Sequence, residues 1–129
     1  MHNLTLALFV FLLAAPSPAQ ETLKPGDTLS GKLRVVKTHH PNGTPITAYQ
    51  IVVDHPKNFA KEGDFCDPKN PPVTFHLVVM NDKAKLAQLN RNLGKSVKVV
   101  AEDLMCSETA WHIGDVVVFQ WHFAEPAKR

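Results

Sequence analysis

Five short segments of the sequence have the residue pattern of β-strands, and this pattern most constrains the fold. In the first four, apolar and polar side chains alternate, so that every second side chain lies on the same face of a sheet. The fifth is apolar on both faces at its start and aromatic at its end. The predicted strands cover residues 28–37, 46–54, 73–80, 97–102 and 116–123.

One segment between the third and fourth strands has helical spacing instead. The pair Asn81 and Asp82 suits an N-terminal cap, and Gly94 suits the position after the last turn. The apolar stripe of this helix consists of Leu86, Leu89 and Leu93. We therefore expect a short helix from about residue 82 to residue 93.

The order of these elements predicts a mainly β fold, a small five-stranded OB-type barrel with one short helix between strands 3 and 4. The small side chains of Gly31 and Ala101 would suit its narrow interior. A two-layer β-sandwich is the alternative, but it would normally need about seven strands. The barrel is the better match to the pattern.

The connections between the strands differ in kind. Asn42 and Gly43 form a strong hairpin signal between the first two strands. Residues 55–72 are rich in proline and charge, which predicts a long irregular connection. Loops of this length are usually functional or held in place by other contacts.

The start of the chain predicts export. Residues 4–15 form an apolar run, and Ser17 and Ala19 are small residues that suit signal peptidase. The run is shorter than the about 20 apolar residues that span a bilayer, and Pro16 ends it. We expect residues 1–19 to be a signal peptide and residues 20–129 to form a single domain. The mature chain would be periplasmic or secreted, with no membrane insertion after cleavage.

The chain has two cysteines, Cys66 and Cys106. An exported protein meets an oxidising compartment, and only one pairing is possible. A loop of about 40 residues closed in this way contributes about 4 kcal/mol to stability in the chain-entropy model. A catalytic or metal-binding thiol is the alternative, but the sequence has no Cys-x-x-Cys motif. We expect a structural disulfide.

The charge of the chain is nearly balanced, with a formal value of +2. OB barrels often bind single-stranded nucleic acid through a basic groove and stacking aromatic rings. The aromatic residues here have no basic stripe beside them. We therefore expect no nucleic-acid partner.

Two stretches near the C-terminus carry a resemblance to a known family. Residues 93–99 contain a Gly-Lys-x-Val-x-Val pattern, and residues 106–117 contain a Thr-Ala pair beside a histidine. This resembles an uncharacterised bacterial family of exported domains, catalogued as a domain of unknown function. Trp111 and Ile113 stand where that family tends to have histidines, which leaves His112 alone. The resemblance implies an exported OB-like barrel and no particular activity.

The leading functional hypothesis is a non-enzymatic module that binds or inhibits another envelope or secreted protein, without a cofactor. Its surface would combine the 55–72 loop, the 105–115 loop and the last strand. Tryptophan is a frequent interface anchor. Both tryptophans could instead close the ends of the barrel. The candidate binding residues are Trp111, His112, Trp121, Phe123 and Phe65.

A metal-binding module is the first alternative. Imidazole is a common ligand for zinc or copper, and the best candidates are His112, His76 and His122. A site needs three or four ligands that converge on one point, whereas these histidines are scattered along the sequence. We therefore expect no specific metal site.

A small hydrolase is the second alternative. A nucleophile, a base and an acid occur together in one loop, as Ser107, His112 and either Glu108 or Asp115. No nucleophile-elbow glycines surround the serine, and proximity in sequence does not make a triad. We therefore expect no catalytic residues.

Overall fold

The computed structural model describes residues 10, 22–59, 66–67 and 69–125. The predicted signal peptide, apart from Val10, and the candidate Phe65 lie outside these residues. The described elements follow the predicted order. They are β1 (Asp27–His39), β2 (Pro45–Val53), β3 (Thr74–Leu77), α1 (Lys83–Arg91), β4 (Ser96–Cys106) and β5 (Val116–Phe123).

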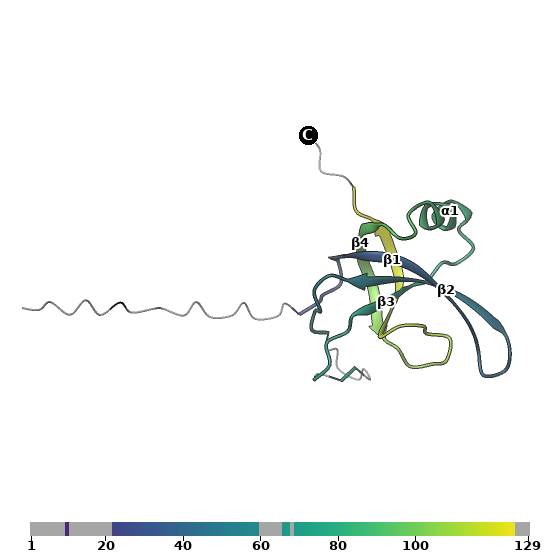
Figure 1. The fold of residues 1–129 in the computed structure, drawn as a ribbon, viewed down its shortest axis with the longest axis horizontal. Helices are drawn as coiled ribbons and strands as arrows, with labels where there is room; N and C mark the ends of the chain where they lie inside the picture. Colours follow the sequence, from purple (N-terminus) through teal and green to yellow (C-terminus); the bar gives the residue numbers. More distant parts are fainter. Residues whose placement is uncertain (1–9, 11–21, 60–65, 68, 126–129) are drawn as a thin grey trace, which may run out of the picture.

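The five strands close into a barrel in the order β1-β2-β3-β5-β4 (Figure 1). The β3–β5 pair is parallel and the other neighbours are antiparallel. β1 closes the ring because its first half pairs with β4 while its second half pairs with β2. The predicted five-stranded barrel with a helix between β3 and β4 is confirmed.

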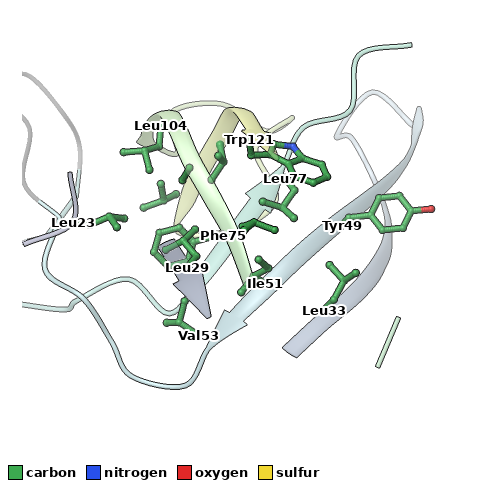
Figure 2. Close-up of a cluster of buried hydrophobic side chains, with 14 of the residues drawn as sticks. Leu23, Leu29, Leu33, Tyr49, Ile51, Val53, Phe75, Leu77, Leu104 and Trp121 are labelled. Atoms are coloured by element: carbon green, nitrogen blue, oxygen red, sulfur yellow. The ribbon is translucent and has the colours of Figure 1, made fainter. Parts of the chain in front are cut away.

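Inward side chains from every strand fill the barrel (Figure 2). In β1, β2 and β3, period-two alternation places these side chains on one face, as the sequence predicted, whereas register shifts between β4 and β5 interrupt the alternation there. Gly31 is buried where β1 crosses closely over the backbone of Val52 and Val53 in β2. Fully buried residues of the core include Leu29, Leu33, Ile51, Phe75, Leu77, Val99, Ala101, Val116 and Val118.

The helix α1 begins where the sequence predicted. The side chain of Asp82 accepts a hydrogen bond from the backbone N–H of Lys85 at 2.9 Å, which caps the first turn. Of the predicted apolar stripe, Leu89 is fully buried and Leu93 packs against the core. Leu86 is 38% exposed, so the prediction that it lies on the buried face is wrong.

Two strands differ most in length from the prediction. β3 ends at Leu77 instead of residue 80, because the chain then leaves β2 and turns at Asn81, which has a positive φ of 49°. β4 continues to Cys106 instead of ending at residue 102. A register shift around Asp103 interrupts its alternation, and for this reason the sequence pattern hid the second half of the strand.

β1 and β2 together extend beyond the barrel as a two-stranded arm (Figure 1). β1 pairs with β4 only through residues 27–32, and β2 pairs with β3 only through residues 49–52. Residues 36–39 and 45–48 therefore pair only with each other. We call this part, with the turn 40–44, the arm.

Candidate binding surface

The loop between β4 and β5, residues 107–115, folds over the outer face of β2 and β3. Its two ends are joined, because the backbone N–H of Ser107 donates to the carbonyl of Asp115 at 3.1 Å. The hydroxyl of Ser107 also donates to the carbonyl of Gly114. The loop is therefore closed at its base before it contacts the barrel.

A buried glutamine connects this loop to the barrel. Gln50 of β2 is only 4% exposed, although it points away from the core. Its amide nitrogen donates to the carbonyl of Ile113, and its amide oxygen accepts a hydrogen bond from Nε of Arg34 at 2.9 Å. Since a buried polar side chain is costly without partners, these bonds explain why a glutamine is tolerated here.

His76 of β3 holds the same loop residue from the other side. Its Nδ1 accepts a hydrogen bond from the backbone N–H of Ile113 at 3.1 Å. Burial lowers the pKa of His76 from 6.5, and the nearby His112 lowers it further. An unprotonated Nδ1 is the form that can accept this bond, so the lowered pKa and the loop position support each other.

Asp115 fixes the end of the loop against the start of β3. Its carboxylate accepts hydrogen bonds from the backbone N–H groups of Val73 at 2.9 Å and Thr74 at 3.1 Å. Its own backbone N–H donates to the hydroxyl of Thr74 at 2.9 Å. The carboxylate is thus occupied by backbone donors.

The tip of the loop presents a tryptophan. The ring of Trp111 stacks on His40 of the arm, with 4.0 Å between ring centroids and 22° between planes. Trp111 nevertheless remains 46% exposed. Beside it, the ring of His112 meets Phe119 edge to face at 6.0 Å, and Phe119 is 37% exposed. We call Trp111, His40, His112 and Phe119 the Trp111 surface.

The disulfide predicted from the sequence is present between Cys66 and Cys106. Cys106 is the last residue of β4 and is buried, so the prediction that it lies in a loop is wrong. The bridge ties the β2–β3 connection to the strand end from which the 107–115 loop leaves. It therefore restrains both loops at the same end of the barrel.

A hollow of about 690 Å³ lies beside the arm, between β2 and the segment that leads from β3 into α1. Its apolar lining includes Ile46, Leu77, Val79 and Leu86, which come from three parts of the chain. His76 also lines it, so the hollow lies next to the strand residue that holds the 107–115 loop.

Trp121 does not belong to the binding surface, which corrects the sequence-based prediction. It is 3% exposed, and its indole N–H donates to the carbonyl of Val78 at 2.9 Å. Lys85 of α1 covers its ring, with the ammonium 4.3 Å from the centroid. Phe123 is half-buried against it, with ring centroids 5.5 Å apart. The shift in strand register before Trp121 places this side chain inside the barrel.

The metal candidates do not converge. His76 and His112 lie near each other beneath the loop, whereas His122 is on β5 and pairs with Glu102 at 3.5 Å. Within the described ranges, no group of three or more histidine, cysteine, aspartate or glutamate side chains is placed to hold a metal ion.

The four residues of the hydrolase alternative do not form a triad. The Ser107 hydroxyl bonds to Gly114, and the Asp115 carboxylate bonds to the β3 backbone. Nδ1 of His112 accepts a hydrogen bond from the backbone N–H of Glu108 at 3.0 Å, within the loop itself. Each of these side chains therefore supports the loop conformation.

His40, Phe119 and Gln50 complete this region. Sequence reasoning assigned the last strand, which contains Phe119, to the surface without naming this residue as a candidate, and it did not assign His40 or Gln50. The position of His40 beside an Asn-Gly turn and the polar Gln50 within an apolar strand were visible in the sequence. Neither signal indicates which loop these residues contact, because their partners are 63 to 71 positions away.

Comparisons with known proteins add no relative. No family model, no curated protein and no solved structure matches the chain. The resemblance to an exported family therefore stays a prediction. In the described part of the chain, no helix is long and apolar enough to cross a membrane.

Proposed function

We propose that the protein is an exported, non-enzymatic binding module that holds another envelope or secreted protein at the Trp111 surface. The observation that carries this proposal is the half-exposed ring of Trp111, which is stacked on His40 and presented by a loop that hydrogen bonds fix to the barrel. Interfaces often depend on such an aromatic anchor.

The rigidity of the loop supports the proposal. Ordering a flexible side chain and its loop during association costs free energy, and a group that is already ordered avoids much of this cost. Trp111 and His40 come from different loops, and the hydrogen bonds of Gln50 and His76 hold the tryptophan loop on the barrel. The disulfide that restrains the same end of the barrel is consistent with an exported chain.

The proposal is tested by partner capture followed by reconstitution. The mature protein, tagged and purified from the export compartment, is used to isolate a stoichiometric second protein, which native mass spectrometry identifies. The dissociation constant is then measured with purified components. We expect Trp111→Ala to weaken binding at least about thirtyfold, since a central tryptophan anchor contributes about 2 kcal/mol or more.

Two control variants separate binding from folding. Trp111→Phe keeps a stacking ring and should retain part of the affinity, while Lys98→Ala changes an exposed residue of β4 and should have no effect. Unchanged affinity of Trp111→Ala, with an intact barrel shown by circular dichroism, would contradict the proposed surface.

A further inference from the structure

The backbone of the arm has one open edge beside the hollow. The residues that flank β2, Thr44 and Asp54, bond to the β1 side, because His40 N–H donates to the carbonyl of Thr44 at 2.8 Å and Asp54 N–H donates to the carbonyl of Ser30 at 3.2 Å. In an antiparallel ladder, the backbone groups of alternate residues point to opposite sides. The odd-numbered residues of β2 therefore point towards β3.

β3 is too short to use all of these groups. Val53 donates to Val73 at 3.0 Å, and the ladder between β2 and β3 ends at the pair of Tyr49 and Leu77. Thr47 is the next residue of β2 whose N–H and C=O point to this side. Among the described residues, neither group has a hydrogen-bond partner on this side, because the β2–β3 ladder does not reach Thr47 and no bond outside the ladders involves it. An open strand edge of this kind can pair with another strand.

The hollow lies along this edge. Thr47 lines it together with Ile46 of the arm, and Val79 and Leu86 line it from the segment after β3 and from α1. Its volume of about 690 Å³ is within the usual range of ligand sites, about 300–1,000 Å³. An unpaired backbone N–H and C=O therefore face a slot with a mixed lining, apolar at Ile46, Leu77, Val79 and Leu86 and polar at Asn81, Asp82 and Lys83.

We propose that this slot binds an extended peptide segment of the partner protein, which adds a strand to the edge of β2. The inference rests on the proposed function and specifies the chemistry of the partner. The N–H and C=O of Thr47 match the C=O and N–H of one residue in an extended chain. The apolar lining takes alternate side chains of that segment, because side chains of a strand point to opposite faces every second residue.

The position of the slot favours a peptide over a second copy of the chain. Thr47, Val79 and Leu86 line the same hollow, so a strand that pairs with Thr47 must lie between β2 and the segment after β3, a space that suits a single extended segment better than the edge of a second barrel. The slot is also linked to the Trp111 surface, because Thr47 and His40 belong to the same arm and His76, which lines the slot, accepts the hydrogen bond from Ile113 in the loop that carries Trp111. A partner anchored at Trp111 can therefore place an extended segment in the slot.

The test uses a displayed library of random octapeptides, selected on the full mature protein, and the synthetic form of the selected peptide. We expect alternating apolar residues in the selected sequences and slower hydrogen exchange at the Thr47 amide when the peptide is bound. Thr47→Pro removes the edge N–H at a position where it has no partner in the described structure, so the barrel should still fold. Peptide affinity should fall at least about tenfold, because the strand pairing is lost.

Matched variants keep the test decisive. Thr47→Val retains the N–H and should bind within about threefold of the wild type, since a β-branched residue keeps the strand conformation. If Thr47→Pro does not fold, the same question is answered on the wild-type protein with peptides N-methylated at single positions. Methylation at the amide that faces Thr47 should abolish binding, and methylation at the next amide should not.

Several results would overturn the inference. One is that the library yields no binding peptide, and another is that the bound peptide does not slow hydrogen exchange at the Thr47 amide. A third is that Thr47→Pro binds the peptide as tightly as the wild type. The last is that native mass spectrometry shows a dimer and the Thr47 amide exchanges slowly without peptide.

Failure of the proposed function has a different signature. If partner capture depends on Trp111 but not on Thr47, the Trp111 surface stands and the peptide slot does not. If the peptide binds the slot while the Trp111→Ala variant captures the partner normally, the peptide slot stands and the Trp111 surface does not.

Discussion

The backbone N–H of Ile113 donates to Nδ1 of His76 at 3.1 Å, which joins a loop residue to a strand residue 37 positions earlier in the sequence. The bond requires the unprotonated form of this nitrogen. Because the pKa of His76 is lowered below 6.5 by burial and by His112, the ring is neutral near pH 7. Protonation of this nitrogen would therefore remove one of the hydrogen bonds that hold the loop of the Trp111 surface on the barrel.

The first prediction concerns pH. The lowered pKa of His76 means that the unfolded chain binds the proton more readily than the folded chain. The stability that depends on the neutral ring is thus fully present above about pH 6.5 and is lost as the pH falls through the lower pKa of the folded state. Urea unfolding between pH 7.5 and pH 5 should show this loss in the wild type.

His76→Asn tests the cause, because its side-chain oxygen can accept the bond from Ile113 without titrating. This variant should lose less stability over the same pH range. His122→Asn changes an exposed histidine of β5 and serves as the control. If all three proteins lose equal stability, His76 is not the group responsible.

The second prediction concerns Gln50. Gln50→Leu keeps the approximate volume of the side chain but leaves the carbonyl of Ile113 without its donor and Arg34 without its acceptor. We expect the free energy of unfolding to fall by about 1–3 kcal/mol. Amide exchange in the 107–115 loop should become faster than in the wild type, and this increase should be larger than any increase in the barrel strands. Exchange in this loop at the same rate in the variant and in the wild type would show that Gln50 does not hold the loop on the barrel.

The third prediction concerns Gly31. A Cβ at this position would lie 2.8 Å from the Cα of Val53 and closer still to the carbonyl of Val52. Because both are backbone atoms, β1 and β2 would have to move apart. Gly31→Ala should therefore lower the free energy of unfolding by about 1–3 kcal/mol or more. Ser30→Ala, at the neighbouring residue, should change it much less. A Gly31→Ala protein as stable as the wild type would contradict the close approach.

The fourth prediction concerns the disulfide. Replacing Cys66 by serine and Cys106 by alanine opens a loop of sequence separation 40. In the chain-entropy model this removes about 4 kcal/mol of stability, measured by urea unfolding. Reduction of the wild type should have a similar effect. A loss below about 1 kcal/mol would mean that the bridge mainly restrains the two loops and adds little to stability.

Local sequence signals predicted much of the fold. Alternation placed Leu29, Leu33 and Phe75 inside the barrel, and Asp82 marked the helix cap, because these signals depend on a few neighbouring residues. With only two cysteines in a chain that the sequence predicts to be exported, the pairing of Cys66 with Cys106 was also determined by the sequence.

The tertiary structure alone decided which residues form the surface. Trp111 and Trp121 are the same residue type, but a register shift in the β4–β5 pair buries Trp121, whereas His40 supports an exposed Trp111. The open edge at Thr47 exists because β3 ends at Leu77, which depends on pairing with two other strands. Such features arise from contacts between distant segments, and the local pattern of a sequence carries no record of them.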